Sequence, residues 1–277
     1  MKRRPTGKNK GKNEMLRSFS TAATGMAAQQ MMVDVTANNL ANINTNGFKR
    51  SQINFQDLLY VKMREEGTEV SSGIKSPSGL EVGSGVRAAS TVKVFSAGEL
   101  TSTDRNLDLA ILGDGFFQIT MPADGTIKYT RDGALQQGPN GELMTSIGYL
   151  IEPAITIPTD ATSVNVGTDG GVNVTTSSGT QSVVGTIQLA RFPNPSGLSS
   201  EGDNLLAQTE ASGSPLTGTA GANGFGSIQA GFLEKSNVQM ITELVNLITA
   251  QRAYETNSRA IRAADDMLQQ AIQIARS

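Results

Sequence analysis

The stretch LRSFSTAATGMAAQQMMVDVTANNLAN, residues 16–42, decides how the ends of this chain fold. Alternating steps of three and four from its first residue reach apolar side chains almost throughout, which predicts an amphipathic helix over 16–42. This spacing is that of a heptad seam, which a helix buries against a partner helix. The seam residues are Leu16, Phe19, Ala23, Met26, Gln30, Val33, Ala37 and Leu40.

The C-terminal end of the chain carries a second seam of the same kind. Ser236 and Gln239 have the spacing of a helix-capping box, which predicts a helix over 237–274. Neither helix can bury its seam alone, so we expect the two ends to pack on each other in a discontinuous, coiled-coil-like domain. The second seam runs from Met240 through Leu244, Leu247, Gln251, Tyr254, Ser258, Ile261, Asp265, Leu268, Ile272 and Ala275.

Between the two helices the apolar pattern changes to the period of two that is typical of strands. The segment FFQITMPADGTIKYTRDG, 116–133, predicts a hairpin with an Asp-Gly turn at 124–125, and an Asn-Gly turn follows at 140–141. Residues 163–192 predict three short strands joined by glycine-rich turns, and 208–227 predict a long polar loop. The predicted fold class is therefore α+β, with a helical domain made from both termini and a central all-β domain.

Charge and composition place the domain boundaries and exclude some partners. Residues 1–14 carry a charge of +5 and the rest of the chain −7, against −2 for the whole. We expect a disordered basic extension followed by an acidic body that does not bind nucleic acid, and no apolar run long enough to insert in a membrane. The expected parts are the extension at 1–14, the helical domain at 15–45 plus 236–277, an extended connector at 46–84 and the β-rich domain at 85–235.

The chain contains no cysteine, histidine or tryptophan. A thiolate nucleophile, an imidazole base and a Cys/His zinc site are therefore excluded. Asp104, Asp108 and Asp114 lie close together in sequence, but nothing in the pattern implies a substrate pocket around them. We expect no catalytic residue, no metal site and no cofactor.

Five asparagines crowd the end of the first predicted helix, namely Asn38, Asn39, Asn42, Asn44 and Asn46. Asparagine tolerates the left-handed conformation that ends helices, which accounts for one or two of them. The others suit a packed polar interface, because an amide both donates and accepts hydrogen bonds without the desolvation cost of a charge. We favour an interface between copies of the chain or close relatives.

Four blocks of sequence together resemble the flagellar rod and hook family of axial proteins. The resemblance covers residues 15–277, and the length from Met15 together with GLEVGSGVR at 79–87 is most similar to the distal-rod branch. The blocks are ANNLANINTNGFKR at 37–50, TDRNLDLAILGDGFFQI at 103–119, YTRDGALQ at 129–136 and SNVQMITELVNLITAQRAYETNSRAIRAADDMLQ at 236–269.

The resemblance implies a subunit of a helical tube that transmits torque from the flagellar motor to the hook. It implies export by the flagellar type III apparatus into a rod that crosses the periplasm. The implied partners are further copies of the chain, proximal rod proteins, the hook protein and the P- and L-ring bushing proteins. The terminal helices would line the tube, with a polymer interface at Leu16, Phe19, Met26, Val33, Asn38, Asn39, Leu40, Asn42, Asn44, Asn46, Leu244, Leu247, Gln251, Tyr254, Ile261 and Leu268.

Two alternatives to the distal rod remain open from the sequence. The nearer one is another axial protein, either a hook subunit or a proximal rod subunit. The more distant one is a secreted β-domain adhesin or glycan-acting protein with helical oligomerisation arms. That second class predicts a discrete ligand pocket and a small oligomer instead of an open polymer.

Overall fold

The structure is a computed structural model that describes residues 8–67, 69–71, 74–75, 77–122 and 124–276. It divides into two compact units. Within the described ranges, unit 1 contains residues up to 38, residues 52–91 and residues from 241 onward, whereas unit 2 contains 39–51 and 92–240. Both units are therefore discontinuous in sequence.

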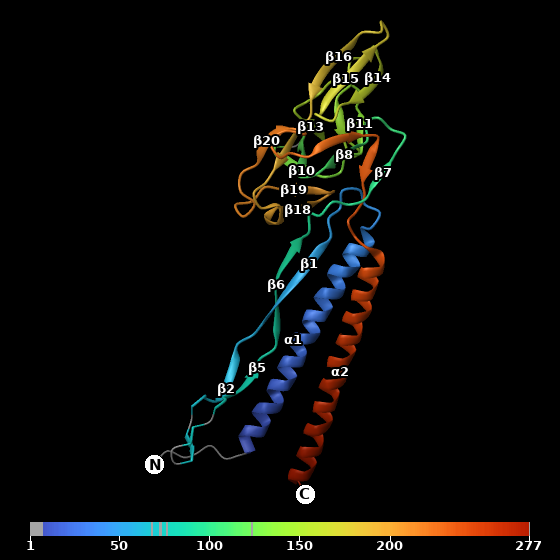
Figure 1. Ribbon diagram of the computed structural model, residues 1–277. Helices are drawn as coiled ribbons and strands as arrows, with labels where there is room; N and C mark the ends of the chain where they lie inside the picture. The colour runs from blue at the N-terminus through green and yellow to red at the C-terminus, as the bar shows by residue number, and fades with distance from the viewer. Residues whose placement is uncertain (1–7, 68, 72–73, 76, 123, 277) are drawn as a thin grey trace. The chain divides into compact units, whose positions relative to one another are not determined.

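Unit 1 is built around two long helices, one from each end of the chain. These are α1 (Lys8–Ala41) and α2 (Met240–Arg276), which run side by side in opposite directions (Figure 1). The segment between them in sequence is made of strands, which confirms the predicted α+β class. In the described part of the chain, neither helix has an apolar stretch long enough to cross a lipid bilayer.

Both helices begin at positions that differ from the prediction. α1 begins at Lys8, so residues 8–14 are helical where a disordered extension was expected, and residues 1–7 lie outside the described residues. No proline interrupts 8–14, and a helix that is already nucleated extends one hydrogen bond at a time. α2 begins at Met240 because the Ser236 hydroxyl accepts a hydrogen bond from the Val238 N–H, 3.3 Å away, instead of capping the helix three residues on.

The expected connector is a long β-hairpin in its described parts, and most of it belongs to the same unit as the helices. The segment 51–93 is called here the connector hairpin, and within it the Leu58 N–H donates to the Gly85 carbonyl at 2.8 Å and closes the base of residues 60–83. β1 pairs with β6, β2 with β5, and β3 with β4. The bounds are β1 (Ser51–Asp57), β2 (Tyr60–Arg64), β3 (Glu69–Ser71), β4 (Ile74–Lys75), β5 (Leu80–Gly83) and β6 (Val86–Lys93).

Unit 2 is built around one large antiparallel sheet. Its strand order is β11-β12-β13-β9-β10-β19-β18, and β17 pairs with both β9 and β20. The bounds are β9 (Phe116–Thr120), β10 (Ile127–Thr130), β11 (Leu135–Gln137), β12 (Leu143–Thr145), β13 (Leu150–Glu152), β17 (Gln188–Arg191), β18 (Ser199–Gly202), β19 (Leu205–Ala207) and β20 (Leu216–Thr219).

Smaller sheets complete unit 2. A meander has the order β14-β15-β16, and two pairs join β7 to β22 and β8 to β21. A short 3-10 helix, η1 (Pro195–Gly197), precedes β18. The bounds are β7 (Leu100–Ser102), β8 (Leu109–Leu112), β14 (Ala161–Val166), β15 (Gly171–Thr176), β16 (Gln181–Thr186), β21 (Ser227–Ala230) and β22 (Phe232–Glu234).

The predicted hairpins are confirmed and the predicted long loop is partly wrong. β9 and β10 pair antiparallel around the Asp-Gly turn, and β11 and β12 pair around the Asn-Gly turn. Gly125 and Gly141 have φ of 68° and 85°, values that glycine adopts without steric cost. Residues 208–227 contain β20, because the edge of β17 is free to take a partner strand there.

The hydrophobic core of the molecule lies in unit 2. Its main cluster is centred on side chains with almost no exposed surface, including Phe117, Ile119, Leu189 and Ile228. A second cluster surrounds Phe116, whose ring meets those of Phe95 and Phe192 edge-on. This packing makes unit 2 a domain with a core of its own.

Candidate assembly interface

The first half of the predicted interface, on α1, is not the most buried face of that helix. The structure does not describe the side chain of Leu16. The other apolar residues predicted there are half-buried, namely Phe19, Met26, Val33 and Leu40. Among the α1 side chains whose exposure the structure describes, the buried ones are instead Ala28, Thr36 and Asn39.

On α2 the predicted seam residues are split between two faces. Leu247, Ile261 and Leu268 are half-buried, whereas Leu244, Gln251 and Tyr254 are exposed. Where burial is described along α2, the buried positions are Glu243, Ala250 and Ala264. The heptad seam of a coiled coil is therefore not what this single copy buries.

Small residues explain the difference. A side chain built on Gly25 of α1 would come within 2.9 Å of the Asn257 amide nitrogen of α2, so the helices approach closely there. α1 has a second neighbour in the hairpin, since the Val86 N–H donates to the Thr24 hydroxyl at 3.3 Å. Contact through small residues on two sides leaves larger apolar side chains of α2 uncovered.

One predicted interface asparagine is engaged within its own chain. The Asn39 amide donates to the Ser51 carbonyl and accepts from the Ser51 N–H, both at 2.8 Å. These two hydrogen bonds to the backbone of one residue have the donor and acceptor pattern of paired strands. They fix the loop that follows α1. Asn39 is buried, which suits a fixed internal contact.

The other asparagines are more accessible. The Asn42 side-chain oxygen accepts from the Thr45 hydroxyl at 3.1 Å, and the Asn46 carbonyl accepts from the Asn204 amide at 3.3 Å. Asn38 and Asn44 are exposed. The asparagine run therefore combines loop-fixing bonds with exposed amides.

A buried cluster of charges, which the sequence patterns did not reveal, lies in unit 2. One Glu234 oxygen is 2.5 Å from the Lys49 ammonium and accepts from the Gly98 N–H at 2.8 Å. The other oxygen is 3.3 Å from a terminal nitrogen of Arg131. Lys49 also donates to the Ser96 carbonyl at 2.7 Å. The cluster connects Lys49, in the loop after α1, to Glu234 in strand β22 and to Arg131, the residue after β10.

Burial dominates the electrostatics of this cluster. It lowers the pKa of Lys49 from its ordinary value of 10.5, although the neighbouring Glu234 carboxylate acts in the opposite direction. Burial likewise lowers the pKa of Arg131. Glu234 thus offsets part of a desolvation cost that two buried cations share.

The sequence pattern placed Asn237 only at the start of a predicted helix, but it has a further role. Its side-chain oxygen accepts from the Arg50 N–H at 2.8 Å, and its amide donates to the Val94 carbonyl at 2.8 Å and the Ser96 hydroxyl at 2.9 Å. These bonds join three chain segments of unit 2 just before α2 begins. The sequence signal that could have identified Asn237 is a polar residue directly before an amphipathic helix.

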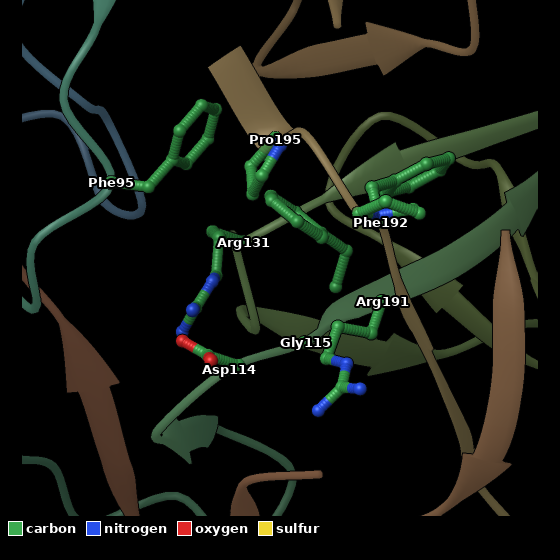
Figure 2. Close-up of a pocket in the computed structure, with 9 residues that line it drawn as sticks. Phe95, Asp114, Gly115, Arg131, Arg191, Phe192 and Pro195 are labelled. Carbon is green, nitrogen blue, oxygen red and sulfur yellow. The ribbon is translucent and has the colours of Figure 1, made fainter. Parts of the chain in front are cut away.

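Unit 2 also has a hollow of about 290 Å³ beside Arg131 (Figure 2). The Arg131 guanidinium lies 5.4 Å from the centre of the Phe116 ring, and its terminal nitrogens donate to the carbonyls of Ile111 and Gly113. These bonds give Arg131 a structural role. Over the described residues, no three carboxylate, imidazole or thiol side chains gather closely enough to hold a metal ion.

A larger groove lies in unit 1. It has a volume of about 670 Å³ and is bounded by α1, α2 and the connector hairpin. Apolar side chains of the hairpin form one wall, and hydroxyl and amide groups of the helices form the other. The lining residues are Arg17, Ser18, Thr21, Ala22, Met63, Leu80, Val82, Gly83 and Asn257.

Three family models match successive parts of this chain. "Flagella basal body rod protein" matches residues 19–49, which include the second half of α1 and the asparagine run. "Flagellar hook protein FlgE/F/G D1 domain" matches 110–174, within unit 2. "Flagellar basal body rod FlgEFG protein C-terminal" matches 229–274, which includes most of α2.

Curated relatives match over nearly the whole chain. The flagellar basal-body rod protein FlgG of Buchnera aphidicola subsp. Schizaphis graminum is 49% identical over 94% of this chain and 100% of its own length. FlgG of Caulobacter vibrioides is 45% identical over 94% of this chain and 99% of its own length. FlgG of Bacillus subtilis is 36% identical over 95% of this chain and 100% of its own length.

Proposed function

This chain belongs to the FlgG family of flagellar basal-body rod proteins, and on that premise we propose that it is a structural subunit of the distal rod. In this role, copies of the chain assemble into a helical tube that carries torque from the motor to the hook. The role is structural and not catalytic. The protein acts in the basal body, after export by the flagellar type III apparatus, where the rod crosses the periplasm.

The observation that carries this proposal is that unit 1 buries few apolar side chains. Among the residues whose exposure the structure describes, its buried apolar residues are three alanines, Ala28, Ala250 and Ala264. Large apolar side chains of the same unit are exposed on α2 and on the connector. They include Leu59, Tyr60, Val61, Met63, Leu80, Val82, Ile241, Leu244, Val245, Ile248 and Tyr254.

Such a unit gains little free energy from burial within one copy. It gains far more when neighbouring copies cover its apolar surface, because stabilisation scales with the apolar area removed from water. Five members of the predicted interface are exposed on the surface where such contacts would form, namely Leu244, Gln251, Tyr254, Asn38 and Asn44. We place the contacts between copies on α1 and α2.

A rod of this kind has two ends and an outer surface. We propose that the chain meets proximal rod proteins at one end and the hook protein at the other. The P- and L-ring bushing proteins would surround it. Its family membership supports these assignments as parts of one flagellar assembly.

Leu244→Asp tests the proposal. Leu244 is 39% exposed on α2, so the variant chain still folds, but an unpaired carboxylate in a subunit contact costs several kcal/mol, on the order of 3. We expect soluble monomers, no filaments by electron microscopy at high protein concentration, and cells that stop before hook assembly.

The matched control is Val183→Asp, which places the same charge at a 66% exposed apolar position of β16 in unit 2. That variant should form filaments like the parent protein. Normal filaments and motility with Leu244→Asp would rule out an interface on this face of α2.

A further inference from the structure

Four exposed apolar side chains near the start of α2 form one continuous face. Ile241, Leu244, Val245 and Ile248 follow one another at spacings of three, one and three, so they lie together on one side of the helix. All four are exposed, and we call them the α2 face. An apolar ridge of this kind on a soluble protein marks a contact site.

The groove in unit 1 offers apolar surface along its hairpin wall. Its hairpin wall consists of Met63, Leu80 and Val82, which are themselves exposed apolar side chains. A volume of about 670 Å³ accommodates several aliphatic side chains. We call it the hairpin groove.

The ridge and the groove of one copy cannot meet each other. Asn257 lines the groove, whereas the centre of the α2 face lies near Leu244, thirteen residues earlier on the same helix. At 1.5 Å per residue the two sites are about 20 Å apart along α2. Whatever fills the groove with this ridge must therefore come from another molecule.

We propose that the α2 face of one copy inserts into the hairpin groove of the next copy. This inference rests on the proposed function as a self-assembling subunit, and it names the surfaces that meet. A contact between two different surfaces is heterologous and leaves one free surface of each kind at the ends, so it propagates without closing. The offset predicts an axial displacement of about 20 Å between the two copies in contact.

Disulfide crosslinking tests the pairing, and the natural absence of cysteine makes the chemistry unambiguous. The double variant Ile248→Cys with Leu80→Cys is assembled and then oxidised. We expect a ladder of covalent oligomers. A mixture of the two single variants should give dimers only, and each single variant alone should stay uncrosslinked. The control pair Ile248→Cys with Val183→Cys should also stay uncrosslinked.

Other results would overturn the inference. Dimers from Ile248→Cys alone would show that two α2 faces meet each other. Polymers that form without any Ile248–Leu80 crosslink would refute the pairing but leave the proposed function standing. If the parent protein forms no polymer, the proposed function itself fails.

A charge-pair experiment covers the case in which the cysteine variants do not assemble. Ile248→Glu and Leu80→Lys alter side chains that are 47% and 52% exposed, so folding is preserved. Each single change should raise the concentration needed for assembly by about tenfold or more, and the double variant should return it close to the parent value. Failure of the double variant to restore assembly would contradict the pairing.

Discussion

At the scale of single residues, Glu234 holds together the buried charges of unit 2. It lies between two buried cations, Lys49 and Arg131, and also accepts from a backbone N–H at Gly98. Removing one partner from a buried ionic cluster leaves uncompensated charge, which is more costly than never having built the cluster. The segment after α1 and the segment before α2 both depend on this one carboxylate.

Glu234→Gln should therefore destabilise unit 2 by about 3 kcal/mol, because both buried cations lose their counter-charge while the side-chain volume is kept. The measurement is the urea midpoint of unfolding followed by circular dichroism. Glu66→Gln is the matched control, since Glu66 forms an exposed ion pair with Lys62. Equal midpoints for the two variants would show that the buried cluster contributes nothing.

A second residue-scale prediction concerns pH. Burial raises the pKa of Asp132 above its ordinary value of 3.8. The ionised carboxylate therefore costs stability at neutral pH, and this cost disappears as pH falls through the raised pKa. Asp132→Asn should be more stable than the parent at pH 7 and equal to it below about pH 3.5.

Asp124→Asn provides a control of opposite sign. Hydrogen bonds from the Thr126 hydroxyl and N–H lower the pKa of Asp124, so its ionised form is favoured in the folded state. This variant should be less stable than the parent at pH 7, and the difference should fade in acid. Asp132→Asn curves that run parallel to the parent curve at all pH values would contradict the assigned cost.

At the scale of elements, α1 is held by two neighbours of different kinds. Gly25 allows α2 to approach, and Thr24, one residue earlier, accepts from the backbone of the connector hairpin. The hairpin approaches so closely because Gly85 has no side chain: a Cβ there would overlap the Thr24 hydroxyl. Gly85 also has a φ of 113°, which favours glycine.

Gly85→Ala should detach the hairpin from α1. The strained φ alone costs about 1–3 kcal/mol, and the overlap with Thr24 adds to it. Hydrogen exchange of the α1 and β6 amides measures the effect as a loss of protection. Gly125→Ala is the control, because Gly125 also has a positive φ but nothing lies within 4 Å of its Cβ position. Unchanged exchange around Thr24 in the Gly85 variant would count against this contact.

At the scale of the whole molecule, the two units differ in what stabilises them. Unit 2 has a hydrophobic core and a buried ionic cluster. Unit 1 has exposed apolar side chains on its helix and hairpin, and its buried apolar positions, where described, are alanines. A subunit with one self-sufficient part and one part completed by neighbours is suited to assembly into a polymer.

Deletion of the outer part of the connector hairpin, residues 60–83, should separate these roles. Residues 60–83 can be replaced by a short turn, because Leu58 and Gly85 are already hydrogen-bonded at its base. Unit 2 should unfold at the same urea concentration as before. The polymer should still form through the helices, but only at a higher protein concentration, because the hairpin wall of the groove is lost. It should also bend more easily, because contacts that bridge neighbouring copies are lost.

Curvature of the polymers in electron micrographs measures the change. A deletion polymer as straight as the parent would show that stiffness resides outside the hairpin. A shift in the unfolding of unit 2 would show that the hairpin contributes to that unit.

Local features of the sequence determined the elements of this protein. The three–four spacing of apolar residues predicted both helices, and the Asp-Gly and Asn-Gly pairs predicted the turns at Gly125 and Gly141. Four motif blocks indicated the flagellar rod and hook family, which the relatives support over most of the chain. These inferences succeed because periodicity, turn conformation and motifs depend on residues that are close in sequence.

Tertiary structure alone decided which helix faces are buried and which groups meet. The seam containing Leu244 and Tyr254 predicted burial, but the close approach at Gly25 and the hairpin beside Thr24 selected other faces. Lys49 and Glu234 meet although 185 residues separate them. No local pattern encodes such contacts, because they depend on how closely small residues let distant segments approach and on where buried charges find partners.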